Sequence, residues 1–241
     1  MSNDELVRLV PFVRIHAEAE VPRECCGLAV RDAGGIVTYV ACSNEARDHE
    51  HFIINATDYA RAEDTGEVTG IVHSHPYSAP VPTLADRSEI ERTGLPWLIV
   101  NHPLGTYTVT LPEGFTAPLI GRPFVHGVHD CYSLVRDYFG RIGIALNDYA
   151  RSWGWWEGSV GPDLYRDNFT HEGFREVPRD TLREHDLILM RIRAARENHM
   201  AVYLGHDVIL HHLIGQPSRR ETYQEFYQRR TTAVLRHQSL M

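Results

Sequence analysis

The sequence has few cysteines, no long apolar run and no surplus of basic residues. The four cysteines, Cys25, Cys26, Cys42 and Cys131, form no CxxC pair and are too sparse for a disulfide scaffold, which indicates a reducing compartment. No apolar run approaches the roughly 20 residues needed to span a bilayer. The formal charge of −8 argues against nucleic acid as the main partner, because no basic surplus exists to displace its counterions.

The start of the sequence also lacks the features of a secretory signal. MSNDELVRLV is acidic where a signal peptide would be basic, and no sustained apolar core precedes a small-residue cleavage site. We therefore expect a soluble protein that is made in the cytoplasm. At 241 residues, with 43% hydrophobic and 23% charged residues, the chain is long enough for one large globular domain or two ordinary ones.

The N-terminal half predicts helices that alternate with strands. Apolar periodicity and end signals predict three helices, the first broken or restarted by Pro11 and the second capped by Thr57 or Asp58. Runs of β-branched residues predict the strands, of which the first two form a hairpin around DAGG and the last two pair around HPLG. The expected helices cover residues 4–19, 56–64 and 85–94, and the expected strands cover residues 27–31, 35–42, 67–75, 97–101 and 107–111.

The pattern lapses in LPEGFTAPLIGRPF, which is rich in proline and has no usable period. We predict a first domain at 1–112, a linker at 113–123 and a second domain at 124–241, in an α+β chain. The second domain is predicted to begin with an amphipathic helix, CYSLVRDYFGRIGI, followed by three strands in DLILMRI, HMAVYLG and DVILHH.

One group of residues in the first domain suggests a metal site. His73 and His75 alternate along a predicted strand, so their side chains share one face and can bind one ion. Asp86 follows near the start of the next helix, and two histidines with one carboxylate make a catalytic zinc site that leaves a position for water. Zinc lowers the pKa of that water to about 7. Glu24 is the candidate to carry its proton, and Thr83 could donate a hydrogen bond to the oxyanion.

The order and spacing of these residues resemble the JAMM (MPN+) metallopeptidases, whose motif joins an upstream glutamate to HSHP and a downstream Ser-x-x-Asp. The resemblance covers about residues 1–111 and implies a JAMM/MPN-like α/β sandwich. It implies that His73, His75 and Asp86 bind zinc and that Glu24 is the acid/base. Thr83 takes the place of the serine, a departure that keeps the hydroxyl. The alternative is that HSHP is merely a polar strand end.

A second group surrounds Cys131 at the start of its predicted helix. Unpaired backbone amides there favour a thiolate, and Asp130 is the expected cap. His199 begins one predicted strand and His211 lies twelve residues later at the end of the next, so antiparallel pairing would bring the two imidazoles together. His199 would hold the thiolate as an ion pair and protonate the leaving amine. His211 would fix the tautomer and orientation of the His199 ring. His212 is a rival to His211, and each residue alone could be ordinary core or surface.

Together these residues resemble the NlpC/P60 cysteine peptidases, whose catalytic helix opens with Asp-Cys and whose first histidine begins a HVGIYLG-like strand. The resemblance covers about residues 124–241 and implies a papain-like fold that cleaves peptidoglycan stem peptides, often beside a D-glutamyl residue. The segment SWGWWEGSVGPDLYRDNF departs from compact members by its length and its tryptophans. Trp153, Trp155 and Trp156 could line a substrate groove or pack in the core.

A JAMM domain followed by an NlpC/P60 domain resembles the tail-tip assembly protein K family of long-tailed phages. The resemblance implies a component of the virion tail tip that is synthesised in the host cytoplasm, with other tail-tip proteins and peptidoglycan stem peptides as partners. It implies a peptidase used in tail assembly or cell-wall penetration, with Zn²⁺ as cofactor. Two alternatives stay open: a structural tail-tip scaffold in which one or both sites are idle, and a cytosolic isopeptidase.

Overall fold

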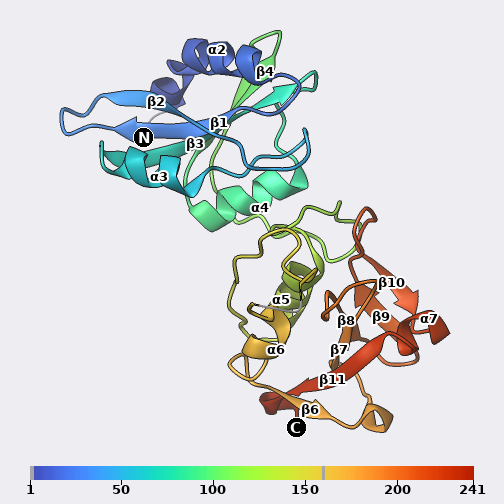
Figure 1. Ribbon diagram of the computed structural model, residues 1–241. Helices are drawn as coiled ribbons and strands as arrows, with labels where there is room; N and C mark the ends of the chain where they lie inside the picture. The colour runs from blue at the N-terminus through green and yellow to red at the C-terminus, as the bar shows by residue number, and fades with distance from the viewer. Residues whose placement is uncertain (1–2, 159–160) are drawn as a thin grey trace. The chain divides into compact units, whose positions relative to one another are not determined.

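The computed structural model describes residues 3–158 and 161–241, and the chain divides into two compact units, Met1–Thr116 and Ala117–Met241 (Figure 1). Each unit combines helices with a β-sheet of its own, so the chain has the α+β, two-domain architecture that the sequence predicts. None of the helices in the described ranges is long and apolar enough to cross a membrane.

The first unit contains a five-stranded sheet. Its helices are α1 (Asn3–Val7), α2 (Val10–Glu20), α3 (Ala56–Glu63) and α4 (Leu84–Thr93), and its strands are β1 (Cys26–Arg31), β2 (Val37–Cys42), β3 (Glu67–Pro76), β4 (Trp97–His102) and β5 (Tyr107–Thr110). The strand order is β2-β1-β3-β4-β5, with β3 and β4 parallel and the other neighbours antiparallel. The predicted hairpin of β1 with β2 and the predicted pairing of β4 with β5 are confirmed.

Two helix starts in the first unit refine or correct the prediction. Pro11 lies in the first turn of α2, where a missing N–H breaks no helical hydrogen bond, and the region predicted as one helix at 4–19 is divided into α1 and α2. The predicted cap of α3 at Thr57 or Asp58 is wrong. Asn55 caps this helix, because its side chain accepts a hydrogen bond from the Asp58 amide.

Helices cover both faces of this sheet (Figure 1). Leu6 and Val13 of α1 and α2 pack with Leu98 in one core, and Ile90 of α4 packs with Trp97 in the other. The sequence ECCGL contributes to both cores, because Cys25 belongs to the first and Cys26 to the second. Its glycine is required, since a β-carbon on Gly27 would lie 2.4 Å from the Val40 carbonyl oxygen.

The second unit contains a six-stranded antiparallel sheet with the order β10-β9-β8-β7-β11-β6. Its strands are β6 (Phe174–Val177), β7 (Leu187–Met190), β8 (His199–Tyr203), β9 (Val208–His211), β10 (Arg219–Thr222) and β11 (Thr231–His237). Its helices are α5 (Cys131–Arg141), α6 (Leu164–Asn168) and α7 (Glu225–Gln228), with short 3-10 turns η1 (Arg179–Thr181) and η2 (Gln238–Leu240).

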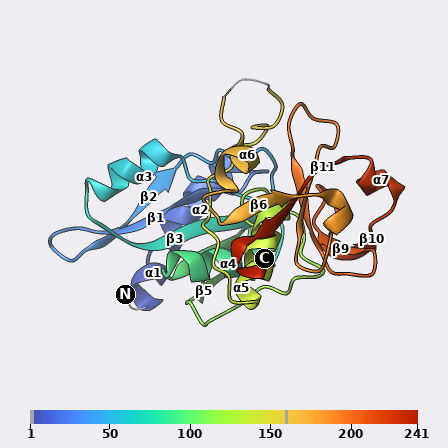
Figure 2. The same cartoon turned by 90° about the horizontal axis from the view of Figure 1, so that it is seen from below.

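The predicted elements of the second unit form its centre. Helix α5 packs against β8 and β9, and the three predicted strands are confirmed as β7, β8 and β9. Strands β6, β10 and β11 are not among the predicted ones, because β6 and β10 are short and highly charged and β11 follows a polar loop. Figures 1 and 2 both place α7 beside β9 and β10.

The segment between the predicted domains contains no helix or strand from 111 to 124. Its later part nevertheless belongs to the second unit. The buried guanidinium of Arg122 donates to the carbonyls of Ala117 and Pro118 and pairs with Asp137 at 2.6 Å, and the Arg122 amide donates to Ser218 Oγ at 2.9 Å. Residues 117–122 are therefore anchored, whereas the sequence predicts a linker over 113–123.

Candidate active sites

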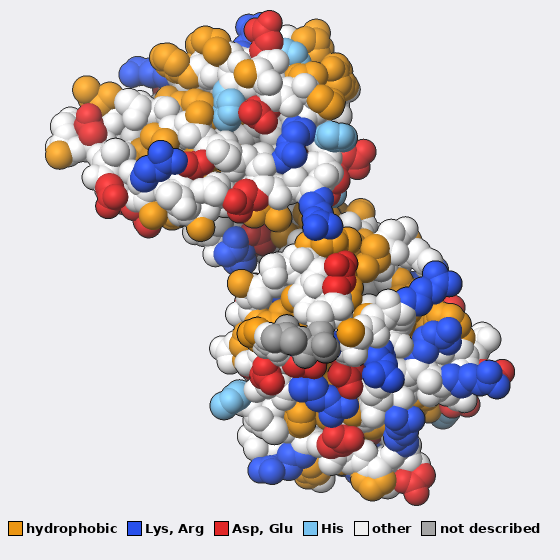
Figure 3. Space-filling view, viewed as in Figure 1, with side chains coloured by type: hydrophobic (Ala, Val, Ile, Leu, Met, Phe, Trp, Pro, Cys, Tyr) orange, Lys and Arg blue, Asp and Glu red, His pale blue; other side chains and the backbone are white. Residues whose placement is uncertain are grey.

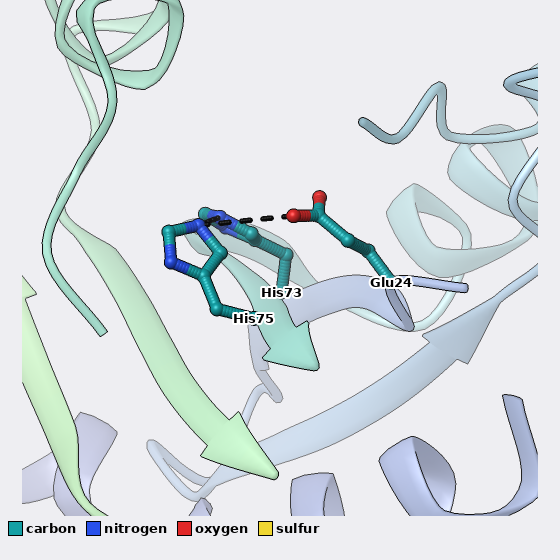
Figure 4. Close-up of side chains that lie close together, drawn as sticks. All are labelled: Glu24, His73 and His75. Atoms are coloured by element: carbon teal, nitrogen blue, oxygen red, sulfur yellow. Dashed lines mark hydrogen bonds and ion pairs between the residues drawn. The ribbon is translucent and has the colours of Figure 1, made fainter. Parts of the chain in front are cut away.

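The first candidate site lies at the end of β3, where His73 and His75 project from the same face of the strand (Figure 4). Their Nε2 atoms are 3.1 Å apart. Strand β1 pairs with β3 so that Cys26 lies opposite His73, and Glu24 comes just before β1. The Glu24 Oε1 atom is 3.8 Å from His75 Nε2. The strand pairing therefore brings the upstream glutamate to the two histidines, although about fifty residues separate them in sequence.

Asp86 reaches the same two imidazoles from the first turn of α4. Its Oδ1 is 3.7 Å from His73 Nε2 and its Oδ2 is 3.5 Å from His75 Nε2. Thr83 caps this helix: its hydroxyl accepts from the Asp86 amide at 3.1 Å and donates to Asp86 Oδ2 at 2.8 Å. The Thr83 hydroxyl thus orients the Asp86 carboxylate in this structure, while its suggested contact with an oxyanion stays a prediction.

Contacts around the two histidines set their orientation. His75 Nδ1 lies 2.9 Å from the Ala79 carbonyl oxygen, so Nδ1 carries a proton and donates, and in the neutral ring Nε2 has the lone pair. Phe52 stacks on the His73 ring at 4.7 Å between centroids, and Trp97 meets it edge-on at 5.5 Å. Within the described ranges, the buried His73 Nδ1 has no hydrogen-bond partner.

The protonation preferences of the two carboxyl groups differ. Burial raises the pKa of Glu24 to about 8, with the negative charges of Asp86, Asp48 and Glu50 adding to the effect and His75 opposing it. Burial also acts against ionisation of Asp86, but the neighbouring His73 and His75 and the hydrogen bonds from Thr83 outweigh it and lower that pKa. One carboxyl group is suited to carry a proton and the other to remain an anion.

These residues fit a divalent metal ion. In a tetrahedral site with metal–nitrogen bonds of about 2.0–2.1 Å, ligand atoms lie about 3.3 Å apart, and the His–His and His–Asp86 distances of 3.1, 3.5 and 3.7 Å are near that value. Glu24 also belongs to a group with His73 and His75 whose ligand atoms lie within 4.8 Å of one another. Asp86 is slightly closer than Glu24 to His75 Nε2, at 3.5 Å against 3.8 Å, and is the more acidic of the two carboxyl groups.

The second candidate site begins at the N-terminus of α5, where Cys131 is the first helical residue. Asp130 is the cap, as predicted: its Oδ1 accepts from the Ser133 amide at 2.9 Å, and Ser133 Oγ accepts from the Asp130 amide at 2.8 Å. Arg151 forms a buried ion pair with Asp130 at 2.8 Å and donates to the Gly127 carbonyl. The thiol is therefore attached to a firmly held helix start.

Strands β8 and β9 bring the two predicted imidazoles together. The His199 Nε2 and His211 Nδ1 atoms are 3.2 Å apart, and the rings meet edge-to-face at 5.3 Å between centroids. His212, the rival of His211, makes an edge contact with Phe124 instead. The structure thus pairs His199 with His211.

Cys131 lies against the same strand but is not hydrogen-bonded to His199 in the part of the chain that the structure describes. Its Sγ atom is 3.3 Å from the Tyr165 hydroxyl, and the Met200 backbone lies close enough to favour the thiolate. Burial raises the pKa of the Cys131 thiol to about 11, with Asp130 adding to the effect, and burial lowers the pKa of His199 well below its ordinary value. In this conformation both groups are neutral.

Sequence reasoning did not find three residues of this site. The Glu221 carboxylate receives a hydrogen bond from His211 at 3.1 Å, Tyr165 contacts the thiol, and Arg151 holds the cap. Tyr165 belongs to the segment 152–169 that departs from compact family members, of which residues 159–160 lie outside the described ranges. Trp155 packs edge-on against Tyr165 at 4.8 Å. A signal for Glu221 was its place in SRRETY, where Arg219 and Glu221 share one face of a strand.

Comparison with protein families assigns each half of the chain. The model of prokaryotic homologs of the JAB domain matches residues 9–110, and the model of the NlpC/P60 family matches residues 121–236. Among solved structures, an NLP/P60 family protein from Staphylococcus aureus, described as similar to a lipoprotein, covers 49% of this chain and 37% of its own at 20% identity and a TM-score of 0.36.

Two curated proteins align with most of the chain. Tail tip assembly protein K of Escherichia phage N15 is 39% identical over 235 residues, which cover 97% of this chain and 96% of that protein. Tail tip assembly protein K of Escherichia phage lambda is 37% identical over 182 residues, which cover 76% of this chain and 88% of that protein. Both alignments extend beyond either single domain.

Proposed function

The chain belongs to the tail tip assembly protein K family, a group of phage tail proteins, and from that membership we propose that its second unit is a cysteine endopeptidase acting on peptidoglycan stem peptides. The fold class is as the sequence predicts, a JAB-like domain followed by an NlpC/P60 domain. The catalytic residues that we propose are Cys131, His199 and His211.

The proposed reaction is an acyl transfer through the thiol. His199 takes the proton of Cys131, and Sγ attacks the carbonyl carbon of a stem-peptide amide. His199 then donates that proton to the amine as the C–N bond breaks, which leaves a thioester on Cys131. With His199 as base, water cleaves the thioester and restores the thiol. His211 keeps the His199 ring oriented throughout.

The observation that carries this proposal is the placement of the three groups. The thiol begins α5, beside the Met200 backbone, while His199 comes one residue before Met200 and pairs with His211 at 3.2 Å. A helix start offers amide N–H groups to the thiolate and to a developing oxyanion. Both groups are neutral before the reaction, so His199 must take the thiol proton as the sulfur attacks.

Digestion of purified peptidoglycan tests the proposal. The wild-type protein should release fragments whose masses identify the cleaved amide, and Cys131→Ala should lose that release by at least about a thousandfold, because the nucleophile is gone. Cys42→Ala is the matched control, since it removes a buried thiol from the other unit and should digest like wild type. Equal digestion by Cys131→Ala would overturn the assignment.

For the first unit we propose a zinc-dependent amidase or isopeptidase, whose target is a tail protein or the wall itself. His73, His75 and Asp86 would hold the ion, which supplies an activated water when bound. Glu24 is placed to move a proton between that water and the leaving amine. Thr83 holds the Asp86 carboxylate through a hydrogen bond from its hydroxyl. The same hydroxyl would stabilise an oxyanion if it donated to that oxygen in place of Asp86.

Metal analysis of the purified protein tests this second proposal. We expect about one zinc per chain in the wild type, and we expect His73→Ala or Asp86→Asn to reduce it strongly, because either removes a ligand from a site of three. His49→Ala is the matched control, since His49 is exposed in a neighbouring loop. A zinc content that is the same in all variants would contradict the site.

The distribution of charge agrees with different partners for the two units. Residues 1–116 contain eight arginines and 17 acidic residues, a formal charge of −9, whereas residues 117–241 contain 16 arginines and 15 acidic residues, a formal charge of +1. Figure 3 shows basic side chains spread over the visible face of the second unit. An anionic wall polymer would be repelled by the first unit and not by the second.

Both relatives are named as assembly proteins, which favours a second candidate function: a structural protein of the tail in which the two sites are idle. Other tail proteins would then be the partners, and the location would be the virion tail tip. Phage that carry Cys131→Ala together with His73→Ala distinguish the two functions. If catalysis is used for wall penetration, tails assemble and infection falls, whereas full infectivity of the double variant would support the scaffold.

A further inference from the structure

Glu221 extends the row of imidazoles behind Cys131 by one group. It lies on β10, two residues after Arg219, which pairs in register with His211 of β9. Its Oε2 accepts hydrogen bonds from His211 Nε2 at 3.1 Å, Arg219 Nε at 2.9 Å and the Tyr227 hydroxyl at 2.9 Å. Three donors to one oxygen are the environment of a carboxylate ion.

This arrangement determines which nitrogens carry protons. A carboxylate only accepts hydrogen bonds, so His211 Nε2 is protonated, and in the neutral ring Nδ1 has the lone pair. That lone pair accepts from His199 Nε2, which lies 3.2 Å away and must itself be protonated. His199 then presents Nδ1 as its basic nitrogen, which is the only one left to take a proton from Cys131.

We propose that Glu221 is a positioning residue of the cysteine-peptidase site: it fixes the tautomers of His211 and His199 and supplies negative charge that favours the imidazolium formed with the thiolate. The inference rests on the proposed function of the second unit. This role differs from a purely structural one, because a substitution of Glu221 changes which imidazole nitrogens carry protons even when the fold is intact.

Other charged groups facing His211 set the size of the effect. Burial lowers the pKa of His211, Glu221 opposes this through its hydrogen bond and charge, and Arg219 adds to the lowering. His199 faces His211 directly, and the neighbouring His212 acts on His199. The Glu221 side chain is 30% exposed, so solvent screens part of its charge. Screening weakens the effect of the Glu221 charge, while the hydrogen bond to His211 stays in place.

The test is the rate of Cys131 alkylation by iodoacetamide as a function of pH, followed by peptide mass. In Glu221→Ala and Glu221→Gln the loss of the charge disfavours the imidazolium, so we expect the half-maximal rate at higher pH than in wild type. Wall digestion should fall roughly 10–100-fold in Glu221→Ala, but at most about tenfold in Glu221→Gln, whose amide oxygen still accepts from His211. Glu225→Gln, an exposed acid on α7, is the matched control and should change neither.

The outcomes separate this inference from the proposed function. An unchanged alkylation midpoint in folded Glu221→Gln, with wild-type digestion intact, would overturn the positioning role and leave the peptidase. A shifted midpoint in a protein whose wild type digests no wall would overturn the peptidase and leave the proton arrangement. If Glu221→Ala fails to fold, the near-isosteric Glu221→Gln still decides between these outcomes.

Discussion

Replacing Arg151 by methionine removes one partner of the ion pair that holds the start of α5. The side chains of Arg151 and Asp130 are only 3% and 4% exposed, and their atoms are 2.8 Å apart. Removal of one partner from such a pair typically costs 3–5 kcal/mol, because the other charge stays buried without compensation. Here Asp130 keeps hydrogen bonds from the Ser133 and Gly127 amides, both at 2.9 Å, so we expect the lower end, about 3 kcal/mol.

Urea unfolding followed by tryptophan fluorescence measures this cost, because Trp153, Trp155 and Trp156 lie in the same unit as the ion pair. For a unit of this size, about 3 kcal/mol corresponds to a fall in Tm of roughly 10 °C. The same change should slow alkylation of Cys131, because Arg151 lowers the pKa of that thiol against the stronger effects of burial and Asp130.

Two variants control this experiment. Arg229→Met removes a partner from the Arg229–Glu225 pair, whose side chains are 75% and 72% exposed, and should leave stability nearly unchanged. Asp130→Asn combined with Arg151→Met should recover part of the loss, since asparagine still caps α5 and the buried charge is gone. A cost below about 1 kcal/mol for Arg151→Met, or no recovery in the double variant, would refute the account of the pair.

Two further predictions concern pH and packing. Burial lowers the pKa of His129 and of His212 to about 4, whereas each imidazole protonates near pH 6.5 in the unfolded chain. Between these values only the unfolded chain binds the proton, so the free energy of unfolding is highest above pH 6.5 and decreases as the pH falls toward 4. Urea unfolding should therefore show the second unit losing about 2 kcal/mol per imidazole between pH 7 and pH 5, and equal stability at both would contradict this. Gly27→Ala should destabilise the first unit by about 1–3 kcal/mol, because the new methyl group would meet the Val40 carbonyl; an unchanged urea midpoint would show that the strand pair can yield.

The elements that carry local signals were predictable. Pro11 and Asp130 mark helix starts by chemistry that acts within one turn, and the apolar runs of β3, β8 and β9 indicate strands. The cap of α3 was misassigned because several residues able to cap, among them Asn55, Thr57 and Asp58, stand close together there. Strand β10 was missed because its four residues are mostly charged and its stability comes from pairing with β9.

The residues of the candidate sites could be predicted, but their geometry could not. The spacing of Glu24, His73, His75 and Asp86, and that of Cys131, His199 and His211, could be recognised as motifs. Their distances could not, because they depend on the register between β1 and β3 and between β8 and β9. Whether His211 or His212 meets His199 follows from the register between β8 and β9.

By itself the sequence determined the class of each half, its local helices and strands, and the residue types available for catalysis, since these depend on neighbours within a few positions. Only the tertiary structure decided three contacts. Glu221 accepts a hydrogen bond from His211, Tyr165 contacts the Cys131 thiol, and Arg151 pairs with Asp130. Those contacts join residues 10, 34 and 21 positions apart in the chain. A contact over such separations is created by strand pairing and core packing, which no local pattern of side chains specifies.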